Sequence, residues 1–180
     1  MNRIIAVVVI GLLSGAGCSS EAPTTDAPVV TDAPAPSETI GQKNARESAQ
    51  SYLDSMSFSR RGLIDQLLFE GFSQAEAEYG TDSMKADWNQ QAALSAQNYL
   101  DSMSFTRSGL IDQLVFEGFS QAEAEYGTDS MKADWNKQAA LSAQNYLDSM
   151  SFSRSGLIDQ LLFEGFSQAE AEYGVNAVGF

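Results

Sequence analysis

The chain has 180 residues, 43% of them hydrophobic, with 24 acidic side chains against 10 basic ones, a single cysteine and no histidine. Without histidine there is no imidazole metal ligand and no Ser-His or Cys-His nucleophile, so we expect neither a cofactor nor a metal site. A formal charge of -14 repels phosphate backbones and argues against nucleic-acid binding.

The first 17 residues have the layout of an export signal. A positively charged start from Met1 to Arg3 precedes an apolar run from Ile4 to Leu13, and the small residues Ser14 to Gly17 follow. Such an apolar run is too short to span a bilayer as a helix, which favours a signal peptide over residues 1–17.

Cys18 comes directly after these small residues. The stretch from Leu13 to Cys18 resembles a bacterial lipobox, in which the cysteine takes acyl chains such as palmitate and becomes the mature N-terminus. It departs from that pattern at Gly15, where a larger apolar residue is preferred. We therefore predict an extracytoplasmic protein that is anchored to a bacterial membrane through lipidated Cys18. The alternative is an ordinary cleaved signal that leaves a free cysteine.

Residues 18–42 have the composition of a disordered, acidic linker. They contain all four prolines of the chain, mixed with alanine, threonine and four acidic residues. Such a segment buries too little apolar surface to order itself. We expect it to act as a stalk.

The rest of the chain consists of one sequence unit that is repeated three times. The segment from Tyr52 to Asn98 recurs as Tyr99 to Asn145 with four differences, and a third copy starts at Tyr146. A period of this length is typical of tandem modules. We place the three repeats at residues 43–86, 87–133 and 134–180.

Each repeat is expected to be helical, which makes the fold all-α with helix-turn-helix-like units. In the central copy Asp87 can cap a helix that runs to about Ser102 or Met103. Thr106 can cap a second helix, with Gly118 accepting the left-handed conformation that closes it.

A third, shorter helix follows in the same copy. Ser120 and Glu123 have the spacing of a capping box, and the helix is predicted to run through Tyr126 and to end at Gly127. Proline is absent after Pro36, which favours helices throughout.

Two tryptophans, Trp88 and Trp135, open the helices that link successive copies, while the equivalent position before the first copy is Gly41. Aromatic residues at helical spacing are usually core residues. We interpret these two as candidate inter-repeat packing residues and not as an exposed binding site.

Each second helix also carries an arginine in its first turn and a glutamate at its end, both unfavourable for the helix dipole. The simple explanation is local pairing, for example Arg60 with Asp54, or pairing between copies. The functional alternative is a partner-binding face of arginine beside exposed phenylalanine, because both residue types are enriched in interface hot spots. Its candidate residues are Arg60, Phe69, Arg107, Phe116, Arg154 and Phe163.

The repeated Gly-Leu-x-x-Gln-Leu-x-x-Glu-Gly-Phe stretch, at residues 62–72, 109–119 and 156–166, resembles the repeat of Ltp-like host cell surface-exposed lipoproteins. The signal, Cys18 and stalk precede it in the order that this family shows. The resemblance implies a helix-turn-helix-like repeat displayed outside a bacterial membrane and, in phage or prophage members, superinfection exclusion. It brings no catalytic residues.

The function that we predict is therefore a non-enzymatic, surface-exposed lipoprotein whose repeats bind a protein partner, such as a phage injection component, and block the passage of phage DNA. The alternative is a structural or adhesion lipoprotein of the host envelope with no phage role. An enzyme would need a Ser/Lys nucleophile pair, and none of the four lysines lies in a recognisable serine motif.

Overall fold

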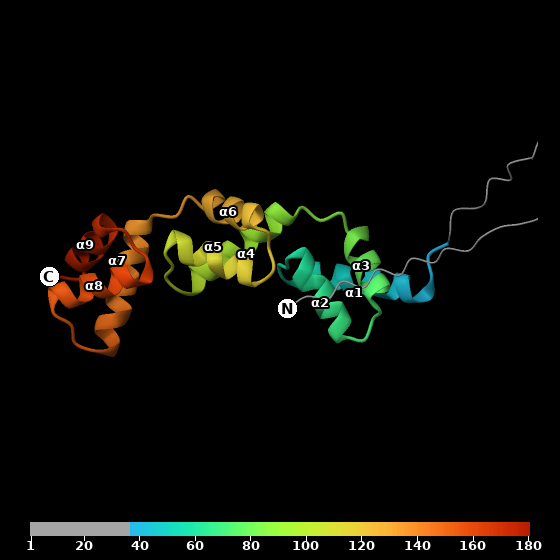
Figure 1. The fold of residues 1–180 in the computed structure, drawn as a ribbon, viewed down its shortest axis with the longest axis horizontal. Helices are drawn as coiled ribbons and strands as arrows, with labels where there is room; N and C mark the ends of the chain where they lie inside the picture. Colours follow the sequence, from blue (N-terminus) through green and yellow to red (C-terminus); the bar gives the residue numbers. More distant parts are fainter. Residues whose placement is uncertain (1–36) are drawn as a thin grey trace, which may run out of the picture. The chain divides into compact units, whose positions relative to one another are not determined.

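The structure is a computed structural model that describes residues 37–180, and within this range it contains nine α-helices and no strand (Figure 1). The predicted all-α fold with three helical repeats is confirmed. The predicted signal peptide, Cys18 and most of the predicted linker lie outside the described residues. From residue 37 to residue 180, no helix has the length and apolar character that crossing a membrane requires.

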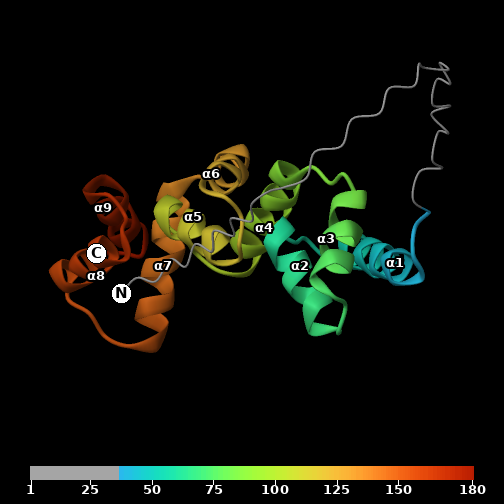
Figure 2. The same ribbon diagram turned by 45° about the vertical axis from the view of Figure 1, so that its right-hand side comes forward.

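The helices form three modules of three, one for each copy of the repeat. They are α1 (Ile40–Ser55), α2 (Arg60–Phe69) and α3 (Gln74–Ser83); α4 (Trp88–Ser102), α5 (Arg107–Phe116) and α6 (Gln121–Ser130); and α7 (Trp135–Ser149), α8 (Arg154–Glu164) and α9 (Gln168–Ala177). Figure 2 shows each module as its own set of three helices.

The helix starts lie where the sequence predicted them in the central module. The side chains of Asp87 and Thr106 accept hydrogen bonds from backbone amides in the first turns of α4 and α5. Ser120 and Glu123 form the complete capping box of α6. Gly118, with a φ of 94°, follows the end of α5 in the left-handed conformation that glycine adopts without strain.

The predicted end of the third helix is wrong. Gly127 does not close α6 but lies inside it, buried where α6 packs against α4. A Cβ atom on Gly127 would lie 2.7 Å from the carbonyl carbon of Ala92, so the missing side chain lets the two helix backbones touch. Gly80 and Gly174 lie in the same way at the other two modules.

The first helix also begins earlier than the predicted repeat boundary. Thr39 and Gln42 form a capping box, so α1 starts at Ile40, inside the segment predicted to be linker. Arg46 forms an ion pair with Glu38, with 2.9 Å between Nε and Oε1, which ties the residue just before the cap to the helix.

Each module has its own core. In the second module the fully buried side chains of Leu110 and Leu114 from α5 pack between Ala92 of α4 and Ala124 of α6. The other two modules repeat this arrangement as separate clusters. The buried residues of each cluster come from the three helices of one module, so each module buries most of its own apolar face.

One core position differs between copies and makes a test possible. Thr81 and Thr128 are fully buried, and their hydroxyl oxygens have no hydrogen-bond partner, whereas the third copy has Val175 at this place. Burying a hydroxyl without a partner costs free energy.

Replacing Thr128 by valine should therefore raise the free energy of unfolding by about 1 kcal/mol, because the shape is kept and the unpaired hydroxyl is lost. Chemical denaturation of the full chain measures it. Thr106→Val is the matched control and should lower stability by about 1 kcal/mol, since it removes a helix cap. Loss of stability in Thr128→Val would contradict the assignment.

Candidate partner-binding surface and inter-module cleft

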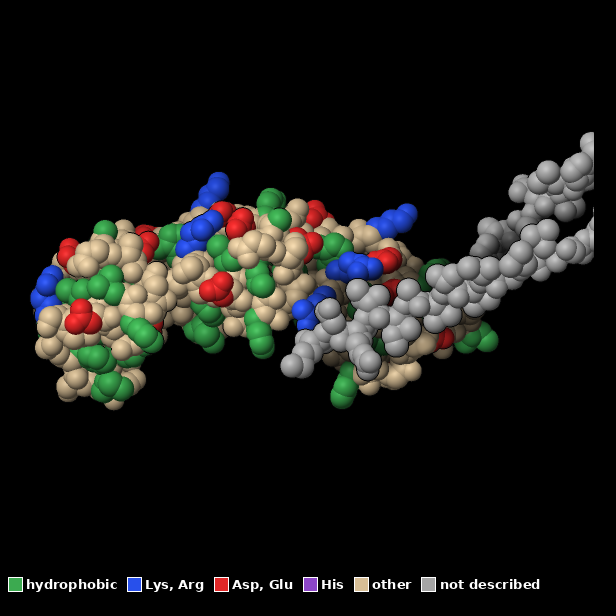
Figure 3. Space-filling model, in the orientation of Figure 1, with side chains coloured by type: hydrophobic (Ala, Val, Ile, Leu, Met, Phe, Trp, Pro, Cys, Tyr) green, Lys and Arg blue, Asp and Glu red, His purple; other side chains and the backbone are tan. Residues whose placement is uncertain are grey.

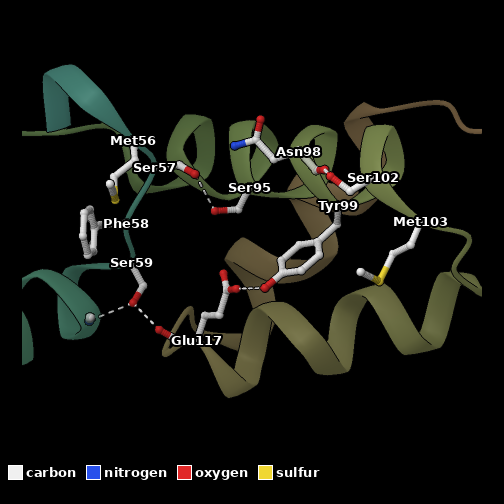
Figure 4. Close-up of a pocket in the computed structure, with 11 residues that line it drawn as sticks. Met56, Ser57, Phe58, Ser59, Ser95, Asn98, Tyr99, Ser102, Met103 and Glu117 are labelled. Atoms are coloured by element: carbon white, nitrogen blue, oxygen red, sulfur yellow. Dashed lines mark hydrogen bonds between the residues drawn. The ribbon is translucent and has the colours of Figure 1, made fainter. Parts of the chain in front are cut away.

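A cleft of about 510 Å³ lies between the first and second modules (Figure 4). One wall comes from the connection between α1 and α2, the opposite wall from one face of α4, and Glu117 at the end of α5 closes it. Its walls are a mixture of thioether, aromatic and hydroxyl groups. The lining residues are Met56, Ser57, Phe58, Ser59, Gly62, Ser95, Asn98, Tyr99, Ser102, Met103 and Glu117.

Serine hydroxyls join the two modules at the edges of this cleft (Figure 4). Ser59 Oγ donates to the backbone carbonyl oxygen of Glu117 at 2.6 Å and accepts from the amide of Gly62 at 2.9 Å. The hydroxyls of Ser57 and Ser95 lie 2.8 Å apart. The N-terminus of α2 thus meets the C-terminus of α5, an arrangement in which the opposite ends of two helix dipoles attract.

The glutamate at the end of each second helix has a local hydrogen-bond donor. The Tyr99 hydroxyl donates to the carboxylate of Glu117 and accepts from the side-chain amide of Gln113 at 3.0 Å. Burial, and then the hydrogen bond to the Glu117 carboxylate, raise the pKa of Tyr99 above its usual value. The neutral phenol is the form that the site holds, so this contribution to stability is present at neutral pH and is lost only at strongly alkaline pH. Tyr52 and Tyr146 hold Glu70 and Glu164 in the same way.

The arginine of each second helix pairs within its own module. Arg60 contacts Asp82, near the end of α3, through two hydrogen bonds of 2.7 and 2.8 Å, and Arg107 contacts Asp129 likewise. The example pairing of Arg60 with Asp54 is therefore wrong, because the α3 carboxylate offers a bidentate partner. The Arg60 hydrogen bond lowers the pKa of Asp82. About half of each side chain is exposed, so the pair contributes at most about 1 kcal/mol.

The third copy has a weaker version of this contact. Arg154 donates to the amide oxygen of Asn176 at 3.0 Å, because asparagine stands where the other copies have aspartate. The partner is neutral, so no carboxylate offsets the positive charge of Arg154 in this contact.

The three phenylalanines of the proposed face are strongly exposed: Phe69, Phe116 and Phe163 show 87%, 85% and 86% of their surface. On the face drawn in Figure 3, apolar side chains are interspersed with acidic, basic and neutral ones. Arg60 and Phe69, however, lie at opposite ends of α2, about 13 Å apart along its axis and on opposite sides. Within one module, the structure therefore does not bring the arginine and the phenylalanine of the second helix onto one face.

The tryptophans lie at the module junctions. Trp88 opens α4 and is half-buried against the core cluster of the first module, and Trp135 opens α7 and packs against that of the second. Nearby, the side-chain oxygen of Gln91 accepts from the backbone amide of Phe58 at 3.2 Å. Gln138 and Phe105 repeat this bond at the second junction.

The profile of the host cell surface-exposed lipoprotein family matches three times, at residues 41–84, 87–131 and 134–178. The chain belongs to this family. Among curated proteins no match is found. A similar solved structure is that of Ltp, a superinfection exclusion protein from the Streptococcus thermophilus temperate phage TP-J34. It is 31% identical in sequence, with 51% of this chain and 95% of that chain covered and a TM-score of 0.48.

Sequence reasoning missed the cleft and the contacts that form it. Ser59 looks only like a helix cap, and nothing local indicates that its hydroxyl also reaches a carbonyl 58 residues later. The recurrence of Tyr99, Gln113 and Glu117 in all copies was a usable signal for their hydrogen bonds. It was hidden because almost every other position recurs as well.

Proposed function

We propose that this protein is a membrane-anchored, surface-exposed bacterial lipoprotein that protects the cell from phage by blocking the passage of phage DNA. The observation that carries the proposal is the threefold match to the host cell surface-exposed lipoprotein family. The export signal predicted over residues 1–17, directly before Cys18, supports it. The 31% identical Ltp is a superinfection exclusion protein, and the same role is proposed for this chain.

The modules act by binding and not by catalysis in this proposal. Exposed phenylalanines recur once in each module, and Met56 and Met103 line the cleft at the first junction. Aromatic side chains are enriched in interface hot spots, and flexible thioether side chains adapt to irregular protein surfaces. The partner is therefore a protein, and a component of the phage injection machinery is the candidate that fits an exclusion role.

The anchor can be tested by replacing Cys18 with alanine. If Cys18 carries the lipid, the variant should leave the membrane fraction and collect in the medium or as unprocessed precursor, because the acyl chains that hold it are lost. Metabolic labelling with a radioactive fatty acid measures this directly. Ser19→Ala is the matched control and should keep the label. A wild-type chain without Cys18-dependent label would contradict the lipoprotein assignment.

The exclusion role predicts a specific stage of failure in infection. A protein held outside the membrane cannot act on cytoplasmic replication, so cells that produce the chain should adsorb phage normally while phage DNA fails to appear inside. Adsorption is measured by free-phage titre, and DNA passage by quantitative amplification from washed cells. Plaque numbers should fall in parallel with internal DNA.

Two results would separate the alternatives. Equal plaque counts with and without the protein, across phages of its native host, would contradict exclusion and favour a structural or adhesion role in the envelope. Loss of adsorption would also contradict a block at DNA passage. A triple variant Phe69→Ser, Phe116→Ser and Phe163→Ser should lose protection while keeping its helical content, because these side chains support no core.

A further inference from the structure

The junction between modules has two complementary halves, and within residues 37–180 the first and the third module each keep one half uncovered. At each junction a module presents the N-terminus of its second helix, which we call the leading half. The next module presents the opposite half, which consists of the C-terminus of its own second helix and the neighbouring face of its first helix. The first junction uses Ser59, Ser57 and Gly62 on one side and Ser95, Glu117 and Gly118 on the other.

Burial shows what the junction covers. Ser59 and Thr106, on the leading half of the two internal junctions, are 2% and 6% exposed, whereas the equivalent Ser153 of the third module is exposed. The hydroxyl of Ser153 caps α8 in the same way, so its local structure is kept. The leading half is therefore formed in the third module, with no later module covering it in residues 37–180.

The opposite half is exposed on the first module. Phe119 and Phe166 are 3% and 4% exposed, while the equivalent Phe72 is only half-buried. A Cβ atom on Gly118 would lie 2.9 Å from Ser59 Oγ across the junction, whereas Gly71, with the same φ of 94°, has nothing within 4 Å. Ser48, which corresponds to the buried Ser95, is half-buried as well.

We infer that these two exposed halves bind one another between separate chains, so that the protein associates with a second copy of itself end to end. The occupant is indicated by the first internal junction, where the equivalent side chains are in contact. At the second junction Ser142 donates to the Glu164 carboxylate instead, and only the close approach of the end of α8 to the start of α5 is kept. Ser151 of one copy would meet Ser48 of the next as Ser57 meets Ser95, and Ser153 would reach the carbonyl of Glu70. An interface whose two sides differ leaves one free half at each end and continues into longer arrays.

The junction between chains is weaker than the internal one. Gly41 replaces the tryptophan that packs across each internal junction, and Asn44 replaces the longer Gln91. The internal junctions also gain from chain connection, which supplies millimolar effective concentrations. Association between chains therefore requires a high local concentration, and it does not depend on the proposed phage role.

Paired cysteines test this inference. The full chain carrying Ser48→Cys with Ser151→Cys is concentrated and treated with a mild oxidant, and products are separated by mass under non-reducing conditions. We expect a ladder of disulfide-linked multimers. The internal pair Ser57→Cys with Ser95→Cys is the matched control and should close within one chain, since the two hydroxyls lie 2.8 Å apart. Each single variant and the wild type, which share Cys18, are oxidised in parallel.

A ladder in the double variant that is absent from the single variants supports the end-to-end junction. The inference would be overturned if the internal pair closes but the Ser48→Cys, Ser151→Cys double variant forms no more multimers than the single variants. A second test uses the chain that carries no introduced cysteine. In this chain Ser48→Lys should reduce self-association, measured by sedimentation at high concentration. Gln50→Lys, with the same charge change on another side of α1, should leave it unchanged.

Discussion

Replacing Trp88 by alanine is expected to lower the free energy of unfolding by about 3 kcal/mol. The indole belongs to α4 but packs on the core cluster of the first module, so its loss opens a cavity under a neighbouring module's helices. The half-buried ring places the effect at the lower end of the range for large aromatic truncations. Thermal and chemical denaturation of the full chain measure it.

Hydrogen exchange should locate this effect. Amides of the first module and of the first turn of α4 should exchange faster, while those of the third module keep their protection, because each module has its own core. Tyr126→Ala, which removes an exposed aromatic ring, is the control and should change stability little. An unchanged melting curve for Trp88→Ala would instead make Trp88 a binding candidate.

Replacing Gly127 by alanine should destabilise the second module by about 2 kcal/mol. The added methyl group would lie 2.7 and 2.8 Å from the carbonyl carbon and oxygen of Ala92, and a backbone cannot rotate aside as a side chain can. The helices α4 and α6 must therefore separate. Overpacking costs of up to about 3 kcal/mol outweigh the gain of about 1 kcal/mol in helix propensity.

Gly41→Ala is the matched control for this substitution. Its methyl group would meet the Glu76 side chain, whose carboxylate completes the capping box of α3. Moving that carboxylate aside costs at most about 1 kcal/mol, which the gain in helix propensity largely offsets, so the variant should change stability little. Adding Ala92→Gly to Gly127→Ala should not restore stability, because the closest atoms are those of the backbone. Restoration would show that the contact is between side chains.

Local signals in the sequence predicted most of the fold. Asp87, Thr106 and Ser120 have their hydrogen-bond partners within three residues, so short-range chemistry was sufficient to place the helix starts. Gly127 misled the prediction because glycine either ends a helix or permits a close helix crossing, and only the distant Ala92 distinguishes the two.

The candidate site was less predictable for the same reason. The partner of Arg107 is Asp129, 22 residues away, and that of Ser59 is a carbonyl in the next module. Neither spacing is a helical or turn period, so three-dimensional packing alone determines them. The exposure of Phe116 was predictable because Leu110 and Leu114 fill the apolar side of α5, and Phe116 points away from it.

The independence of the three cores has a consequence for how the gene can change. Matching positions such as Tyr52, Tyr99 and Tyr146 are spaced by 47 residues, and the copies are nearly identical. Recombination between two misaligned copies therefore adds or removes one whole period, and every hybrid module regains a complete set of core side chains wherever the crossover falls. Array length can vary among descendants by single unequal exchanges, without an intermediate that fails to fold.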